Sequence, residues 1–538
     1  MKKSIKFLAL TLSAVLAAGT FCGCGEKKQE AVKTGDTFTY WVPLDSSVAQ
    51  THQSFGDIMM YQEMEKRTGT KIEFLHPSPG STGNEAFQVL LAAGDYPDMV
   101  EHWWSVYPGG GDQAVKDGVI LRLNEYLEEY APNYYDLMEG KKAEENGYMY
   151  KATTISEEGN YYGFKNLNVG RYRGFQGIFI RKDLLDKWGL DVPETIDEWD
   201  KVLETAKNDG IKYPITGNSS VLAFFSSAWG HDGTTFFVDN GKVKFGPFED
   251  SYKPYVAKLA EWMKKGYIDI DYVTNDTTII NGQITNGTSI AGNCYVSNIS
   301  KLLSAMEEKD PQFDLVACPF PVMKKGDIPC FQPYQAPASE PIVAITTQCG
   351  AENEDRYKEA IQWCDYLYSE EGMILKSFGI EGDTFTRQTD ENGEEHFVYT
   401  DKILKNYEEY GASNVGAALY YHFLPANHPG FNQHPDYFKG YYPYQQQADA
   451  LETWNKYVEE AANHVFPAVT YTGEEASRKA TIEANGKSNL SAAVSNIILG
   501  KAPLDSLDDA IEAAKKAGYE ELLEINQAAY DRYAKAIK

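Results

Sequence analysis

The sequence predicts an α/β protein, because strand and helix patterns alternate along the chain once the N-terminal segment is set aside. Strand-like runs cover residues 37–42 and 71–75, and a third strand begins at Asp98. Helical patterns separate these strands, and the second of them covers residues 85–93. This β-α-β-α-β order predicts a doubly wound parallel sheet.

Helix boundaries are marked by residues that satisfy free backbone groups. Gly69 and Gly94 follow the first two helical patterns, where a left-handed residue commonly ends a helix. Thr195 and Glu198 have the spacing of a capping box before another apolar-periodic segment. The C-terminal stretch is helix-rich and is broken at Gly518.

The first residues have the pattern of an export signal. Three lysines precede an apolar stretch, residues 7–18, which is shorter than the roughly 20 residues that a membrane-spanning helix needs. Phe21 to Gly25 resembles the lipobox of bacterial lipoproteins, with Gly23 before the modified Cys24. We expect a signal peptide over residues 1–23, lipidation (palmitate included) of Cys24, and a flexible tether over 24–36. The alternative is an ordinary cleaved signal.

Composition narrows the classes of partner. A formal net charge of −28 over 538 residues disfavours binding to nucleic acid and anionic lipid and favours neutral or cationic ligands. Five cysteines remain beyond the signal region, without a C-x-x-C pair, so neither a disulfide framework nor a zinc site is indicated. The 37 tyrosines and 9 tryptophans favour carbohydrate binding, since these rings have an apolar face and a polar tip.

Four motifs in order along the chain resemble those of the family 1 extracellular solute-binding proteins, in particular the large lipoprotein branch of Gram-positive bacteria. They are the A-x-G-D-x-P-D turn at 92–98, the R-K-D-L-L block at 181–199, the G-I-E-G block at 379–393 and the closing helices at 497–533. The resemblance implies a two-lobe periplasmic-binding-protein fold of the maltose-binding type with a multi-strand hinge. It also implies that a monomer at the outer face of the cell membrane captures an oligosaccharide in the inter-lobe cleft and delivers it to an ABC permease.

The same resemblance divides the chain into discontinuous lobes. Crossings between lobes are expected near residues 164–176, 341–347 and 385–399. The expected lobe 1 comprises residues 37–163 and 341–385, and the expected lobe 2 comprises residues 164–340 and 386–538.

Ligand-binding residues are expected in aromatic and polar loops, because ligands of open α/β sheets bind beyond the carboxyl ends of strands. Trp103 and Trp104 are neighbours that would face opposite ways on a strand, so one of them is expected to stack on a sugar. Glu381 either contacts ligand or fixes its own turn. The candidate residues are Trp103, Trp104, Tyr107, Arg171, Arg173, Gln176, Trp229, His231, Asn293, Tyr295, Gln332, Tyr334, Gln335, Glu381, Tyr421 and His422.

The sequence indicates neither an enzyme nor a resident metal or cofactor. His422, His428 and His434 recur at six-residue spacing, which fits no zinc motif. Neither G-x-S-x-G nor H-E-x-x-H occurs. A peptide-binding or other solute-binding importer component and a secreted glycoside-active enzyme remain alternatives to the oligosaccharide-binding protein.

Overall fold

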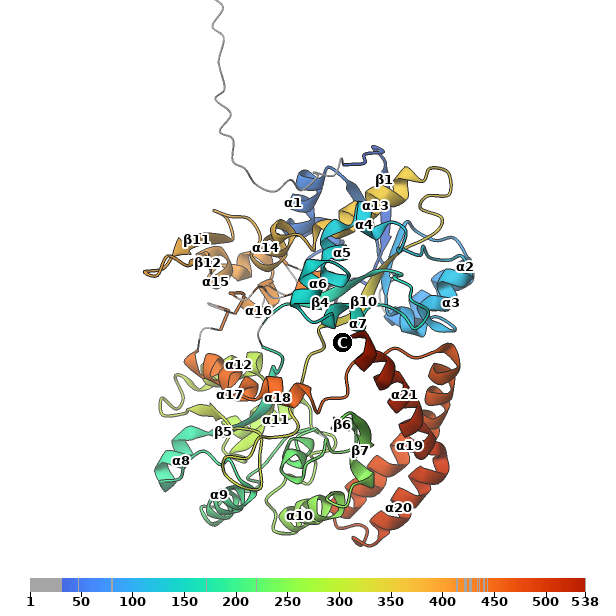
Figure 1. The fold of residues 1–538 in the computed structure, drawn as a ribbon. Helices are drawn as coiled ribbons and strands as arrows, with labels where there is room; N and C mark the ends of the chain where they lie inside the picture. The colour runs from blue at the N-terminus through green and yellow to red at the C-terminus, as the bar shows by residue number, and fades with distance from the viewer. Residues whose placement is uncertain are drawn as a thin grey trace, which may run out of the picture. The chain divides into compact units, whose positions relative to one another are not determined.

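Two β-sheets and two separate hairpins organise the protein, which we describe from a computed structural model (Figure 1). The structure describes residues 31–537 except 47, 79–80, 171, 219, 413–414, 420–422, 425–427, 433, 435, 439–440 and 443. The larger sheet has six strands in the order β13-β4-β10-β3-β1-β2. Their bounds are β1 (Thr37–Trp41), β2 (Lys71–Leu75), β3 (Met99–His102), β4 (Phe164–Asn168), β10 (Ala338–Ile345) and β13 (Gly430–Asn432).

The N-terminal part of this sheet is parallel, as the β-α-β-α-β pattern predicts. β1 pairs in parallel with both β2 and β3. The connecting helices are α1 (Met59–Thr68) and α2 (Gly83–Ala93). Gly69 and Gly94 follow them with φ of 72° and 70°, a conformation that a residue with a Cβ atom seldom adopts.

β10 makes the sheet mixed, because it lies between β3 and β4 and is antiparallel to both. Val343 is opposite Glu101 of β3 on one side and Phe164 of β4 on the other. A strand from residue 338 onward therefore completes a sheet that began at residue 37.

The second sheet has three strands in the order β8-β5-β9, all antiparallel: β5 (Gln176–Arg181), β8 (Ala291–Tyr295) and β9 (Leu315–Ala317). Its core is separate from that of the first sheet and contains the fully buried Trp199, Trp262 and Trp454. Trp199 comes from α9 (Ile196–Asn208), whose capping box of Thr195 and Glu198 is present. The hairpin of β6 (Phe236–Asp239) and β7 (Lys242–Phe245) packs against this second core.

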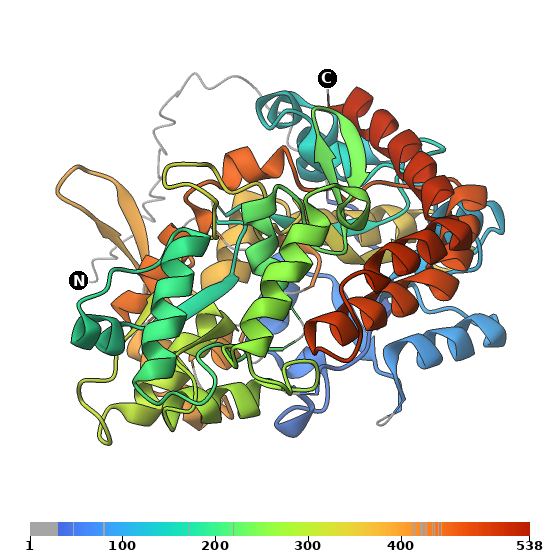
Figure 2. The same ribbon diagram turned by 90° about the horizontal axis from the view of Figure 1, so that it is seen from below.

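Helices surround both sheets. Those near the first sheet are α3 (Gly110–Lys116), α4 (Leu127–Tyr130), α5 (Pro132–Met138), α6 (Lys141–Glu145), α7 (Met149–Ala152), α13 (Asp355–Tyr366), α14 (Glu370–Phe378), α15 (Asp401–Leu404) and α16 (Val415–Ala417). Those near the second are α8 (Lys182–Trp188), α10 (Tyr252–Lys264), α11 (Thr277–Thr285), α12 (Val296–Met306), α17 (Gln445–Asn455), α18 (Val458–Ala462), α19 (Gly473–Ile498), α20 (Ser506–Ala514) and α21 (Glu520–Ala536). The C-terminal helices α19, α20 and α21 lie side by side in both views (Figures 1 and 2). Among the described residues, no helix combines the length and the apolar character needed to cross a membrane.

The expected lobe boundaries stay predictions, but the packing shows which core each segment contacts. The chain leaves the first sheet after Asn168 and enters the second at Gln176. It returns to the first sheet between Ala317 and Ala338. The apolar run at 341–347, which we expected to be a crossing, instead belongs largely to β10 of that sheet.

The third expected crossing, residues 385–399, is a hairpin instead. It is formed by β11 (Phe385–Thr389) and β12 (Glu395–Tyr399). Phe397 and Tyr399 are buried in the core of the first sheet, which also includes Tyr437. Phe438 packs against both cores, and Tyr442 and Tyr444 pack against the second core, so a last passage follows Tyr437.

The expected tether includes residues that are attached to the fold. The backbone N–H and the hydroxyl of Thr34 both donate to Oε2 of Glu359 in α13, at 2.6 and 2.8 Å. Thr70 donates to the other carboxylate oxygen at 2.9 Å. Burial alone would raise the pKa of Glu359, but the hydrogen bonds from Thr34 and Thr70 lower it. A charged acceptor thus holds the segment before β1 against α13.

We expect Glu359→Gln to lower the free energy of unfolding by about 1–3 kcal/mol, because a buried amide N–H₂ would face donors in place of a carboxylate oxygen. Urea unfolding of the mature chain measures this effect. Glu352→Gln, at an exposed position before α13, is the control and should change stability by less than about 0.5 kcal/mol. Equal stability of the two variants would show that the Thr34–Glu359 contacts do not stabilise the fold.

Candidate functional site

One edge of the six-stranded sheet faces the segments that cross to the second sheet. His102 at the end of β3 is opposite Ile342, and Leu167 near the end of β4 is opposite Ala338. The carboxyl ends of β3 and β4 and the start of β10 therefore lie along the same edge. The first two of the three crossings described above join the sheet at this edge, through Asn168 and Ala338.

Trp103 leaves this edge directly after β3. Its side chain is 47% exposed. The ring of His102 packs edge-on against it at a centroid distance of 5.4 Å. Two residues on, the Ser105 hydroxyl donates to Oε2 of Glu340 in β10 at 2.7 Å, which fixes the loop beside the crossing. The indole of Trp103 is therefore held on a rigid element and remains open to solvent.

The neighbouring candidates in this loop are less accessible. Trp104 is only 1% exposed, packs against Phe87, and donates its indole N–H to the Val100 carbonyl at 3.3 Å. Its burial corrects the expectation that it is available to a ligand, so of the two tryptophans we keep Trp103 in the candidate site. Tyr107 is half-buried and donates to Oδ2 of Asp117 at 2.8 Å.

The second sheet also presents an aromatic side chain at the edge where a crossing joins it. Gln176 begins β5 directly after the crossing and is opposite Tyr295 at the end of β8. Tyr295 is 60% exposed. Asn293, two residues earlier in β8, is buried and donates to Oδ1 of Asn218 at 3.2 Å, so it has a partner within its own lobe.

The crossing segments themselves are hydrogen-bonded to each other. The backbone N–H of Gln335 donates to the Arg173 carbonyl at 2.8 Å. Asn455 of α17 accepts from the backbone N–H groups of Arg173 and Gly174 at 2.8 and 2.7 Å and donates to the Gly174 carbonyl at 2.7 Å. Gln332 is buried, and its side-chain amide bonds the backbone on either side of the α17–α18 connection, at the Trp454 carbonyl and the Val458 N–H. Gln332 thus has a structural role.

Two tyrosines join this region without any signal in the sequence. Tyr150 and Arg173 both donate to the Asn168 carbonyl at the end of β4, at 3.2 and 2.8 Å. Burial, together with a smaller electrostatic effect of Tyr334, raises the pKa of Tyr533 in α21 to about 12. Burial also raises the pKa of Tyr150; Arg173 opposes this rise, and Tyr334 adds a smaller increase. Residues 150, 334 and 533 are too far apart in sequence for any local pattern to connect them.

Trp229 and His231 lie in the second core. Trp229 is half-buried against Tyr255 at a ring-centroid distance of 5.5 Å. His231 is fully buried between Tyr252 and Tyr255, and neither of its ring nitrogens has a hydrogen-bond partner among the described residues. Burial lowers the pKa of His231 to about 4, so the imidazole is neutral at physiological pH. Its position corrects the expectation of an accessible ligand contact.

Glu381 lies elsewhere, in the turn before β11. It is exposed and pairs with Arg387 at 3.1 Å, in a surface hollow that Arg67 and Glu371 also line. This position favours the interpretation that it fixes the turn. Arg171, Tyr421, His422 and the expected lipidation site Cys24 lie outside the described residues.

The remaining candidates lie at the ends of β3 and β8 and on the segments that join the two sheets. Trp103 at the first edge and Tyr295 at the second are exposed rings, and Arg173, Gln176, Tyr334 and Gln335 supply polar groups on and beside the crossings. Rings with an apolar face, accompanied by amide and guanidinium donors, suit a ligand that has C–H faces and hydroxyl edges.

The architecture is that of a two-lobe α/β binding protein. The six-stranded sheet packs against two hydrophobic cores, the three-stranded sheet packs against a third, and the chain crosses between the two sheets. Residues 49–374, more than half of the chain, match the bacterial extracellular solute-binding protein family, and the chain belongs to that family.

Relatives and solved structures agree with this assignment. The chain is 25% identical to lipoprotein LipO of Bacillus subtilis over 396 residues, which is 70% of this chain and 72% of LipO. It is 28% identical over 242 residues to the fructooligosaccharide ABC transporter substrate-binding protein FusA of Streptococcus pneumoniae, and this match spans 40% of the chain and 43% of FusA. Its fold is similar to an extracellular solute-binding protein of Bifidobacterium longum subsp. infantis, with a TM-score of 0.70 and 18% identity over 92% of this chain and 98% of that one. FusA in complex with kestose gives a TM-score of 0.68 and 19% identity over 93% and 100%.

The buried His231 predicts a specific effect of pH on stability. An unfolded histidine has a pKa of about 6.5, above the value of about 4 in the folded protein, so the unfolded state binds the proton first as the pH falls. Stability is therefore lost between these two values. When the pH is lowered from about 7.5 to about 5, we expect the free energy of unfolding to fall by roughly 2 kcal/mol more in wild type than in His231→Phe. Urea unfolding of both proteins at both pH values measures this difference.

The neighbouring Asp232, whose pKa burial raises to about 7, has the opposite effect on stability, but it is present in both proteins and cancels in the difference. Identical losses of stability in wild type and variant would contradict a buried neutral His231.

Proposed function

We propose that this protein is the carbohydrate-binding component of an ABC importer, binding an oligosaccharide between its two lobes and delivering it to a permease. One observation carries the proposal: each sheet presents an exposed aromatic ring, Trp103 or Tyr295, at the edge where the crossings attach. A ligand stacked on both rings would bridge the lobes and stabilise the closed state.

The comparisons support the class of ligand. FusA is named for fructooligosaccharides and has a structure with kestose. Another protein of similar fold, AlgQ2, is an alginate-binding protein, with a TM-score of 0.66 and 22% identity. The net charge of −28 favours a neutral oligosaccharide over an anionic one for this chain.

The lipid anchor on Cys24 and the monomeric state are part of the same proposal. LipO, a relative that covers most of this chain, is named a lipoprotein, which supports attachment to the outer face of the membrane. A diacylglycerol group on Cys24 would hold the binding domain close to the permease, since two acyl chains give stable anchoring.

The purified mature chain, with Cys24 replaced by serine to prevent lipidation, should bind one neutral oligosaccharide and release it unchanged. Calorimetry against fructan-, xylan-, mannan- and glucan-derived oligosaccharides, together with galacturonan fragments and a peptide mixture, identifies the ligand. Chromatography of the recovered ligand checks that no bond was cleaved. Binding of peptides alone would overturn the carbohydrate proposal, and hydrolysis of the ligand would favour a glycoside-active enzyme.

Trp103→Ala should weaken binding of that oligosaccharide by at least about 1 kcal/mol, roughly fivefold in Kd, because it removes a stacking surface. Its melting temperature should stay near that of wild type, since the side chain is largely solvent-exposed. Val89→Ala, at an exposed apolar side chain of α2 that is not among the candidate ligand residues, is the control and should leave Kd unchanged. Unchanged affinity of Trp103→Ala would remove this loop from the site.

A further inference from the structure

The turn of the β11–β12 hairpin brings a histidine and two carboxylates together outside the proposed sugar site. The backbone of Asp390 bonds that of Glu394 at 2.9 Å and closes the turn. Oδ1 of Asp390 accepts from the backbone N–H groups of Asn392 and Glu394, at 2.9 and 2.8 Å. These bonds fix the carboxylate so that its other oxygen, Oδ2, lies toward His396.

His396 lies between two carboxylates. Its Nε2 is 3.5 Å from Oδ2 of Asp390, and its Nδ1 is 3.4 Å from Oδ2 of Asp436. Asp436 is buried and comes from the segment after β13, which packs in the first core. A proton on Nδ1 can thus be directed to Asp436, which leaves the lone pair of Nε2 directed toward Asp390 and the turn.

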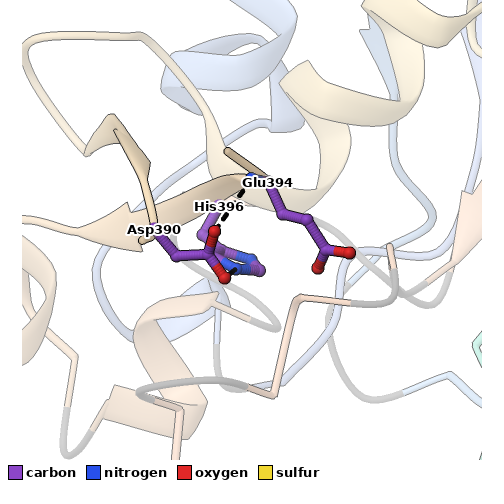
Figure 3. Close-up of side chains that lie close together, drawn as sticks. All are labelled: Asp390, Glu394 and His396. Atoms are coloured by element: carbon purple, nitrogen blue, oxygen red, sulfur yellow. Dashed lines mark hydrogen bonds and ion pairs between the residues drawn. The ribbon is translucent and has the colours of Figure 1, made fainter. Parts of the chain in front are cut away.

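Glu394 completes the group. One ligand atom from each of Asp390, Glu394 and His396 lies within 4.8 Å of the other two. Figure 3 shows the carboxylate of Asp390 beside the imidazole of His396, with the side chain of Glu394 on the other side of the ring in this view and its carboxylate extending away from it. Asp390 and His396 are half-buried and Glu394 is exposed, so solvent and an ion can reach the group.

The distance between Nε2 of His396 and Oδ2 of Asp390 is compatible with a shared metal ion. At 3.5 Å these two atoms also form a long hydrogen bond, as Nδ1 of His396 and Oδ2 of Asp436 do at 3.4 Å. Two ligands at about 2.0–2.1 Å from a tetrahedral zinc ion are roughly 3.3–3.4 Å apart. A buried carboxylate on the far nitrogen of a metal-bound histidine is also the usual support of such a site.

We propose that Asp390, Glu394 and His396 bind one zinc ion, with Asp436 orienting the imidazole through Nδ1. The mixed nitrogen and oxygen donor set suits Zn²⁺, whereas an all-oxygen set would suit Ca²⁺. Arg387, the basic residue of β11, is already paired with Glu395 and Glu381, at 2.8 and 3.1 Å. The bound ion would stabilise the hairpin turn and, through His396, its contact with the segment that contains Asp436.

Titration of the untagged, EDTA-stripped mature chain with ZnCl₂, followed by calorimetry, tests this site. We expect one saturable zinc site in wild type, and His396→Gln and Glu394→Gln should each weaken it by at least about tenfold. Glu391→Gln is the matched control, because it removes an exposed carboxylate from the same turn but not from the ligand set, and it should stay within about twofold of wild type. Asp436→Asn should also weaken binding, with circular dichroism as the check of its fold.

Three results would overturn the proposal. They are the absence of zinc binding by wild type, an equal loss of zinc affinity in Glu391→Gln and Glu394→Gln, and binding of Ca²⁺ in place of Zn²⁺. The titration contains no sugar, so its outcome is independent of the proposed transport function.

Discussion

The backbone pairing of β10 with both β3 and β4 is the interaction on which the rest of the structure depends. Buried N–H and C=O groups in the middle of a sheet need partners on both sides, and here residues 338–345 supply them to strands that precede them by more than 150 residues. Along the chain, all strands of the second sheet therefore lie between β4 and β10 of the first sheet. The crossings, and the strand edges beside them, follow from this order.

The candidate site depends on the same constraint. Trp103 directly follows β3 and Tyr295 ends β8, so both rings lie at the ends of sheet strands. The segments between the sheets are tied together through Arg173, Gln335 and Asn455, whose polar groups are satisfied by one another. A ligand that contacts both rings would bind to surfaces that are already held in place, so little ordering entropy would oppose binding.

The sequence predicted the alternation of strands and helices and the helix ends at Gly69 and Gly94, because local backbone preferences decide these features. The sequence predicted less well which candidate site residues are exposed. Adjacent tryptophans predict that one ring is buried and one exposed, but not which; packing against Phe87 decides that Trp104 is the buried one. His231 resembles a loop residue in sequence, yet it is enclosed by Tyr252 and Tyr255, which lie more than 20 residues later.

The sequence by itself determined the α/β class and, through its ordered motifs, the solute-binding family, because these depend on local pattern and on the identity of residues along the chain. The tertiary structure decided which sheet the apolar run at 341–347 joins, how Asn455 bonds the backbone of Arg173, and how Asp436 faces His396. These contacts join residues tens to hundreds of positions apart. No local spacing encodes them, because long-range packing alone brings such residues together.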